Sequence, residues 1–507
     1  MQSNDMSLKT ALIFGNEMVL QRDKPLAIWG DALPGKKVEL GIQGKYTSVI
    51  AGENGTWKAI IPPLAVSECE ILTICCEKEK LEYTNVAVGE VWIAGGQSNM
   101  EFVMQSEAMF QTEIEQCENP RIRFFDYPKI SYEQQISLLP HKTEGFWRRC
   151  DKDNLKYYSA VGYYYAKTLE QELHIPIGIV GCNWGGSTAS CWMDGEYCKE
   201  IDGKSWWEEY EETVKSLKMN EYEEALKTDY NVLHSDWIDT QMPELLSQEA
   251  TLEGLKAAYL EYDMPILVGP KSPNRPSGLY ETMLKKLVPY GMRGVIWYQG
   301  ESDDVKAEMY GEMQTALIKN WRELWEEEFP FLFVQLPPFQ GYGRATGANF
   351  PEIRRQQQAV AESVENVGMV VTSDLGSQYD LHPKQKGPVG DRLALMALTK
   401  VYDKEIICES PSLVSGYFEA DTLVLKFENV GAGLQVRGER IEALEILQNN
   451  LLVTDYSFTV QKNCIVIRYN AWIDAAEIIV RFACQPYYQV NLYNSVSLPA
   501  RPSEIKI

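Results

Sequence analysis

The sequence has 507 residues, which favours about three domains over one, and its 45% hydrophobic and 24% charged residues are close to the average of folded globular proteins. Its 48 Lys and Arg stand against 72 Asp and Glu, and the formal net charge of −24 repels phosphate backbones and anionic membrane surfaces. These numbers exclude a small single-domain module and a broadly disordered chain, and they argue against a nucleic acid or a membrane as partner.

The first twenty residues and the cysteines together predict a cytoplasmic protein. That segment lacks a basic start followed by an apolar run, and no stretch of the chain approaches ~18 consecutive apolar residues, the length of a membrane span. The 11 cysteines are an odd number and include the pair Cys75-Cys76, but none has the spacing of a zinc site. We therefore expect reduced, mostly buried thiols and no membrane segment.

Residues 1–90 predict a β-sandwich of jelly-roll type. Short apolar runs are broken by turn signals such as Gly30-Asp31 and Pro34-Gly35. Strands that recur every ~8–12 residues between such turns are typical of sandwiches. No helical pattern interrupts this segment.

Residues 91–404 predict an α/β domain with a parallel sheet. Apolar bursts such as VWIAG, IPIGIVG and FLFVQL are typical of buried strands. Between them, helical spacing predicts helices at 159–174, 305–328 and 351–364. Strands that alternate with helices form parallel sheets covered by those helices.

Residues 195–262 predict a helical insertion within the α/β part. The segment is rich in Glu and Lys, has helical apolar spacing and lacks a matching strand. We interpret it as a solvated surface excursion. A lid or subunit contact that carries Trp206 and Trp207 is the alternative.

Residues 405–507 return to the two-residue period of strands, in stretches such as LVLKFENV and EIIVRFA. The chain therefore reads as β, then α/β, then β. A second sandwich is expected here, either separate from the N-terminal one or packed with it.

The first candidate for chemistry is Ser98, in the run GEVWIAGGQSNM at residues 89–100. An apolar strand there leads through small residues into a predicted helix. Such a turn exposes the serine Oγ, and the helix N-terminus can stabilise an oxyanion. A serine at this position also caps helices well. Ser98 is therefore either a nucleophile or an N-cap.

Two more strands end in polar turns at the edge where open α/β sheets bind ligands. Gly185-Gly186 follows the strand IPIGIVG, and paired glycines let a main-chain N–H approach a ligand or simply form a tight turn. The turn lacks the spacing of a phosphate-binding loop. Gln299 ends the strand GVIWY, and its amide can donate to an oxyanion or pair with loop carbonyls.

The fourth candidate is the loop SQYDLHP, which carries Asp380 and His382. A serine hydroxyl needs a base to remove its proton, and a carboxylate orients that base and stabilises the imidazolium. Among the four histidines, His382 alone has a carboxylate beside it in such a loop. An ordinary histidine would give activity that rises with pH at about 6–7.

Together and in this order, the four segments resemble the sialate O-acetylesterase-like branch of the SGNH hydrolases. The resemblance rests on GEVWIAGGQSNM, IPIGIVGCNWGGSTASCWM, LVPYGMRGVIWYQGESD and DLGSQYDLHPKQKGPVGDRLA. It extends to MVLQRDKPLAIWG near the start and VNLYNSVSLPARP at the end, so it covers nearly the whole chain.

The resemblance implies an α/β/α hydrolase domain flanked by β-sandwich material, without a metal or organic cofactor. It makes Ser98 the nucleophile, His382 the base and Asp380 its carboxylate partner. The main-chain N–H groups of Ser98 and Gly185 and the amide of Gln299 would form the oxyanion hole.

Two positions depart from the wider SGNH pattern. That class places its acid three residues before the histidine, where this chain has Tyr379, so Asp374 is a second candidate beside Asp380. The third block usually carries asparagine, and Gln299 stands in its place.

The predicted function is that of a carbohydrate O-acetylesterase. Its substrate is an acetylated manno- or xylo-oligosaccharide or an O-acetylated sialic acid, with plant-type oligosaccharides favoured, and a homo-oligomer stays open. One alternative is a carbohydrate-binding protein with an inactive central domain, which would lose the Ser98 and His382 pair. Another is a lipid esterase of the same fold, against which the charged insertion argues.

Overall fold

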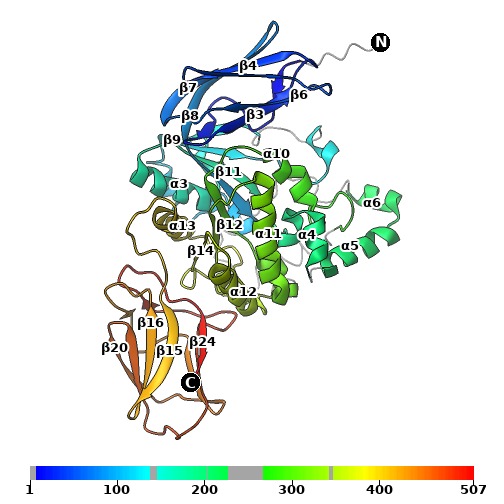
Figure 1. Ribbon diagram of the computed structural model, residues 1–507. Helices are drawn as coiled ribbons and strands as arrows, with labels where there is room; N and C mark the ends of the chain where they lie inside the picture. The colour runs from blue at the N-terminus through cyan, green and yellow to red at the C-terminus, as the bar shows by residue number, and fades with distance from the viewer. Residues whose placement is uncertain (1–6, 138–144, 202–203, 227–266, 342–345) are drawn as a thin grey trace.

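The structure is a computed structural model that describes residues 7–137, 145–201, 204–226, 267–341 and 346–507. The N-terminal strands lie at one end of the molecule, the α/β part lies in the middle, and the C-terminal strands lie at the other end (Figure 1). The order of β, α/β and β agrees with the prediction. The two β segments do not pack together in the part of the chain that is described.

The N-terminal strands join the central sheet through one long strand, β8 (Glu79–Gly96). Its first half pairs antiparallel with β7, and its second half belongs to the central sheet. The strands before it are β1 (Lys9–Thr10), β2 (Val19–Gln21), β3 (Leu26–Asp31), β4 (Lys37–Ile42), β5 (Lys45–Ile50), β6 (Thr56–Ile61) and β7 (Ser67–Cys76). The boundary expected at residue 90 thus falls inside β8, and buried side chains on both sides of it form one hydrophobic cluster.

The central sheet places β8 where the strand order reverses. In spatial order its strands are β10 (Trp147–Cys150), β9 (Asn119–Asp126), β11 (Ile177–Asn183), β8, β12 (Gly294–Tyr298), β13 (Phe331–Val334) and β14 (Val367–Val370). The pairs from β9 to β14 are parallel, as predicted, and β10 is antiparallel. In chain order, β11 forms on one side of β8, and the chain then crosses over to form β12 on the other side. Ligands of open α/β sheets bind at the carboxyl ends of strands beside such a switch point.

Helices cover both sides of this sheet (Figure 1). The long ones are α3 (Ala160–Leu173), α11 (Tyr310–Trp325), α12 (Phe350–Ser363) and α13 (Gly387–Lys400). Three of them confirm the helices predicted from spacing. The shorter ones are α1 (Ser98–Glu101), α2 (Phe110–Glu113), α10 (Lys285–Leu287), and the turns η1 (Met104–Ser106), η2 (Glu133–Ser137), η3 (Leu155–Tyr157), η4 (Ala189–Trp192), η5 (Tyr280–Leu284) and η6 (Glu301–Met309). No helix in the described ranges combines the length and the apolarity that crossing a membrane requires.

The described part of the expected insertion is helical. It comprises α4 (Gly195–Glu200), α5 (Lys204–Ser216) and α6 (Met219–Leu226), and the remainder, from 227 to 262, lies outside the described residues. The Lys306 ammonium stands 3.9 Å from the ring centre of Trp206. The ring of Trp207 packs on Gly195, where a Cβ would lie 2.7 Å from it. Both tryptophans are therefore used in contacts within the chain.

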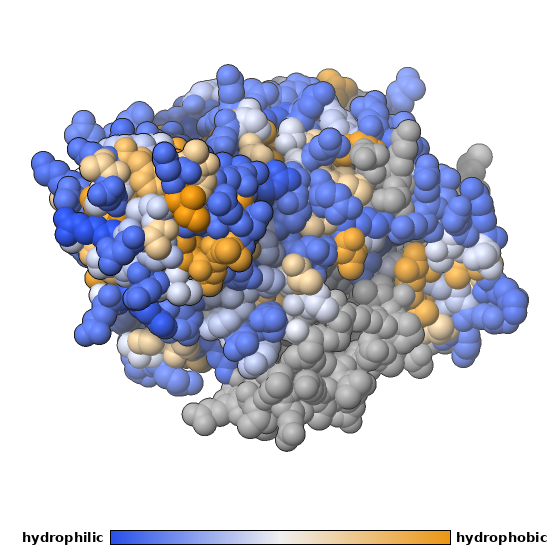
Figure 2. Space-filling view, turned by 90° about the horizontal axis from the view of Figure 1, so that it is seen from below, coloured by the Kyte–Doolittle hydropathy of each residue, from blue (hydrophilic) through white to orange (hydrophobic). Residues whose placement is uncertain are grey.

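The C-terminal strands enclose a hydrophobic cluster of their own. They are β15 (Ser412–Glu419), β16 (Thr422–Glu428), β17 (Gln435–Val436), β18 (Leu444–Gln448), β19 (Leu451–Leu452), β20 (Ser457–Gln461), β21 (Cys464–Arg468), β22 (Ile478–Phe482), β23 (Leu492–Tyr493) and β24 (Ser503–Lys506). The segment between β22 and β23 contacts α12, where Arg354 donates to the main-chain oxygen of Gln485 at 2.5 Å. Seen from this end, the surface is mainly hydrophilic with a local hydrophobic patch (Figure 2).

Candidate active site

Ser98 lies at the carboxyl end of β8, where the chain turns into α1. Gly96, two residues earlier, has a φ of +134°, and a Cβ built on it would lie 2.1 Å from the main-chain oxygen of Tyr298. Only glycine fits between β8 and β12 at this point. The small residues of the motif therefore let the chain turn sharply and present Ser98 beyond the switch point of the sheet.

Ser98 is paired with His382 rather than used as a helix cap. Gln97 is the N-cap of α1, and no side chain caps that helix. The Oγ of Ser98 lies 2.7 Å from Nε2 of His382, a hydrogen bond between residues 284 positions apart. Ser98 is partly exposed and His382 is buried. The geometry is that of a hydroxyl poised to lose its proton to an imidazole.

Asp380 lies beside His382, but it reaches the main chain of the histidine. Its Oδ1 accepts from the His382 N–H at 2.8 Å, and the described hydrogen bonds of the carboxylate include none to the ring. Burial raises the pKa of Asp380, and the N–H of His382 and the charge of Lys386 work against that rise. The carboxylate thus fixes the backbone that carries the base.

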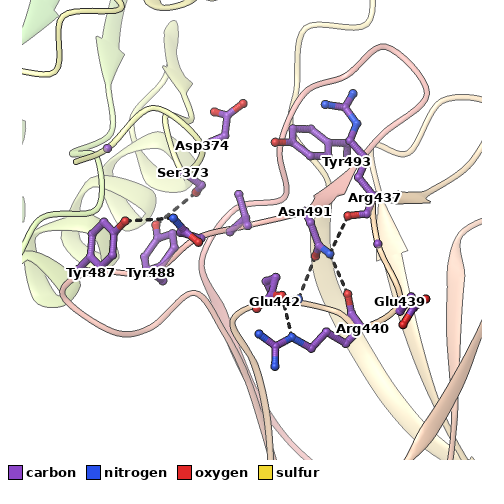
Figure 3. Close-up of a pocket in the computed structure, with 14 residues that line it drawn as sticks. Ser373, Asp374, Arg437, Glu439, Arg440, Glu442, Tyr487, Tyr488, Asn491 and Tyr493 are labelled. Carbon is purple, nitrogen blue, oxygen red and sulfur yellow. Dashed lines mark hydrogen bonds and ion pairs between the residues drawn. The ribbon is translucent and has the colours of Figure 1, made fainter. Parts of the chain in front are cut away.

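Asp374, the second candidate for the acid, is engaged elsewhere. It forms two hydrogen bonds of 2.8 Å with Arg392. It also lines a polar cavity of about 370 Å³ between its loop and the C-terminal strands, where Arg437 and Tyr487 lie (Figure 3). The structure therefore brings Asp380, and not Asp374, to His382.

The two other predicted oxyanion donors have different surroundings. Gly185 is next to Ser98, since a Cβ built on Gly185 would lie 3.4 Å from Ser98 Cβ, but its N–H donates to Glu101 Oε2 at 2.6 Å. The amide of Gln299 donates to Asp303 Oδ2 at 2.5 Å and to the Oε1 of Gln97 at 3.2 Å. A third contact of the amide is the main-chain oxygen of Ser187, also at 3.2 Å. These described contacts match the alternative role of the Gln299 amide, in which it bonds to groups of the neighbouring loops.

Burial keeps the imidazole of His382 neutral. It lowers the pKa of His382 to about 3, and the positive charge of Lys386 lowers it further. Desolvation disfavours the imidazolium because a charged ring loses more hydration than a neutral one. A neutral imidazole is the form of histidine that can accept a proton from a hydroxyl.

Sequence reasoning missed several polar residues around the Ser98 and His382 pair. Asn99 is fully buried and donates to the main-chain oxygen of Leu381 at 3.0 Å. Gln97 Oε1 accepts from the N–H of Ser302 at 3.2 Å, which ties the Ser98 turn to η6. Glu301 and Lys386 are also buried beside Asn99. Only one sign in the sequence indicates that these residues belong to the site, which is that each lies within four residues of a predicted site residue.

No group of three or more His, Cys, Asp or Glu side chains in the described part of the chain is arranged to hold a metal ion.

Comparisons with known proteins agree with this site. Residues 271–399 match the family described as carbohydrate esterase, sialic acid-specific acetylesterase. The sialate O-acetylesterases of Mus musculus and Homo sapiens are each 26% identical over 447 residues, which cover 81% of this chain and 76% and 74% of theirs. The crystal structure of a carbohydrate acetylesterase from Xanthomonas citri is 26% identical, with a TM-score of 0.76, and the match covers 98% of this chain and 99% of that one.

These matches confirm the resemblance to the sialate O-acetylesterase-like branch. They also confirm an acetylesterase hydrolase as the class of enzyme and a mixed α/β fold similar to that of a carbohydrate acetylesterase. The matched family range includes Gln299, Asp380 and His382, whereas Ser98 precedes it.

Proposed function

We propose that this chain removes acetyl groups from O-acetylated sugars by way of an acyl-enzyme on Ser98. The observation that carries the proposal is the 2.7 Å hydrogen bond between Ser98 Oγ and His382 Nε2 at the switch point of the sheet. We also propose that the middle of the chain has the SGNH arrangement and that the terminal strands are sandwiches, because the motif-bearing turns follow β8, β11, β12 and β14 in the order of that family.

In this mechanism, Nε2 of His382 takes the Ser98 proton as Oγ attacks the acetyl carbonyl carbon. The resulting oxyanion is stabilised by the main-chain N–H of Ser98, which in the first helical turn has no acceptor within the helix, and by Gly185 once Glu101 releases it. The imidazolium then protonates the sugar oxygen as the C–O bond breaks. A water deprotonated by His382 attacks the acetyl-serine, and acetate leaves while Ser98 regains its proton.

The substrate we propose is a neutral acetylated oligosaccharide of the manno or xylo type rather than an O-acetylated sialic acid. The formal net charge of −24 disfavours the approach of a sialate carboxylate. Acetate release should be compared on acetylated manno- and xylo-oligosaccharides and on O-acetylated sialic acid. We expect the highest kcat/KM on a neutral substrate. A higher kcat/KM on the sialic acid at low salt would refute this choice.

Replacing Asp380 with Asn should lower kcat by about 10²–10⁴-fold and leave KM nearly unchanged. The amide can still accept from the N–H of His382, but it lacks the negative charge with which, in the proposed mechanism, Asp380 stabilises the imidazolium. Asp374→Asn is the control, and it should lower Tm, since it breaks the pair with Arg392, while kcat stays close to wild type. The reverse pattern in steady-state kinetics would move the acid to Asp374.

The acid limb of kcat/KM should lie below pH 6, lower than an ordinary histidine would give. Burial and Lys386 lower the pKa of His382, so the neutral base persists as the pH falls, and activity is lost only when the free enzyme binds that proton. The measurement is kcat/KM between pH 4 and 9 on a non-ionising acetyl ester, in the range where the protein stays folded by circular dichroism. A limb at 6.5 or above would contradict the burial argument.

A further inference from the structure

A buried lysine stands behind the Ser98 and His382 pair. Lys386 is 1% exposed and lies over the ring of Phe102, 4.9 Å from its centre. Its Nζ donates to Asn99 Oδ1 at 2.5 Å. Burying an ammonium group is costly unless strong partners compensate it, so a hydrophobic residue would satisfy packing better. The lysine therefore calls for a reason other than the stability of the core.

Asn99 follows Ser98 in the chain, and its side chain bonds directly to Leu381, the residue before His382. Because a lysine ammonium only donates, the amide oxygen of Asn99 must face Lys386. Both amide hydrogens then point the other way, to the main-chain oxygen of Leu381 at 3.0 Å and to Glu301 Oε1 at 2.5 Å. Each hydrogen-bonding atom of this amide has a partner. Lys386 thus fixes the orientation in which Asn99 can hold the histidine loop.

The main chain of Lys386 is anchored separately. Its N–H donates to Glu107 Oε1 at 3.2 Å, and Glu107 Oε2 accepts from Tyr164 at 3.1 Å. The start of α13 is therefore held even without the lysine side chain. The amine then serves Asn99 rather than the helix.

We propose that Lys386 is a positioning residue for ester hydrolysis, which through Asn99 holds the His382 loop in register with Ser98. This proposal rests on the proposed function only in that Ser98 and His382 perform the chemistry. Nucleophile and base lie 284 positions apart on two separate segments, and an error of about 1 Å in their placement can cost about 10²-fold in rate.

The charge of Lys386 has a second effect, on the ionisation of His382. The charged and titratable groups that face Lys386 are His382 and Asp380 from its own loop, Glu301 from η6 and Glu107 between η1 and α2. Burial lowers the pKa of Lys386 to about 8, so the amine is still mostly protonated at neutral pH. A cation there disfavours the imidazolium. Its removal should raise the pKa of His382 and move the acid limb of kcat/KM to higher pH.

The test replaces Lys386 with Met and follows hydrolysis of p-nitrophenyl acetate, a substrate that needs no sugar recognition. We expect kcat to fall by about 10–100-fold with KM nearly unchanged, and the acid limb to move to higher pH. Lys386→Arg, which keeps charge and donors, should recover most of kcat and the wild-type limb. Unchanged kcat in a folded Lys386→Met enzyme, or an unmoved acid limb, would overturn the proposal.

A double-mutant cycle with Asn99→Ala tests whether Lys386 acts through Asn99. If it does, the double variant should be no slower than Asn99→Ala alone, since the two changes remove one linkage. Losses that multiply would overturn the proposal. If Lys386→Met does not fold, the other two single variants provide the test. A wild-type kcat in Asn99→Ala would count against the proposal. A low kcat in a folded Lys386→Arg enzyme would also count against it.

Arg123→Met is the matched control for the loss of a buried cation. Arg123 is 2% exposed and donates to the main-chain oxygen of Glu17 at 3.0 Å, near the amino ends of the parallel strands and away from Ser98. It should lower Tm and leave kcat and the acid limb unchanged. An inactive wild-type enzyme on every acetyl ester would refute the proposed function itself, whereas an active wild type with an unaffected Lys386→Met refutes the positioning role alone.

Discussion

Ser98→Ala should lower kcat by about 10⁴–10⁶-fold on any acetyl ester, because without Oγ no acyl-enzyme forms and His382 has no proton to accept. Alanine keeps the Cβ, and the main-chain turn at Gly96 does not depend on the hydroxyl. Tm should therefore stay close to wild type. Steady-state kinetics measures the loss of kcat. Mass spectrometry after treatment with a serine-directed phosphonate identifies the labelled residue, which should be Ser98.

Ser363→Ala is the control for Ser98→Ala. Ser363 ends α12 on the surface, where its hydroxyl donates to the main-chain oxygen of Ala359 at 2.7 Å. Full activity is expected. A well-folded Ser98→Ala enzyme with substantial activity, or a phosphonate adduct on another serine, would remove Ser98 as the nucleophile.

His382→Ala should cost about as much as Ser98→Ala, since the two groups act as one unit. The acid limb of kcat/KM assigned to His382 should disappear with the ring, and the double variant should be no slower than either single one. His174→Ala provides the comparison. His174 ends α3 in the left-handed region with a φ of 56°, and its loss should leave kcat unchanged.

Retention of substantial activity in His382→Ala, with the same acid limb, would show that another group is the base. The 2.7 Å contact would then be a structural hydrogen bond, and the proposed mechanism would fail even though the class of enzyme stands. The pH profile separates this result from simple loss of folding, which circular dichroism would reveal.

Local patterns in the sequence were enough to predict the elements that carry the site. Helical spacing placed α3, α11 and α12 within a few residues, except that 3₁₀ turns of η6 precede α11 in the predicted segment 305–328. Alternating bursts predicted the parallel central sheet. Such patterns are readable because periodicity and turn residues act over a few neighbouring positions. The family resemblance added the roles of Ser98, His382 and Asp380.

Features that depend on contacts between distant segments could not be read from the sequence. The boundary at residue 90 looked plausible because the composition changes there, yet β8 passes through it and pairs with strands on both sides. The amide of Gln299 is predicted at the oxyanion hole, and the structure adds that it bonds to Asp303 and Gln97, which no local pattern indicated. The acid limb was expected at about 6–7, the range of a solvated histidine, whereas the structure buries His382.

The sequence by itself determined the order of β, α/β and β parts, the parallel sheet and the turns in which Ser98 and His382 lie. Only the tertiary structure showed that Asp374 pairs with Arg392 while Asp380 accepts from the main-chain N–H of His382, and that Lys386 and Asn99 join the two loops. The physical reason is that hydrogen bonding and burial depend on three-dimensional proximity. Lys386 and Asn99 are 287 positions apart, and no local pattern records which of the chain's polar side chains will meet.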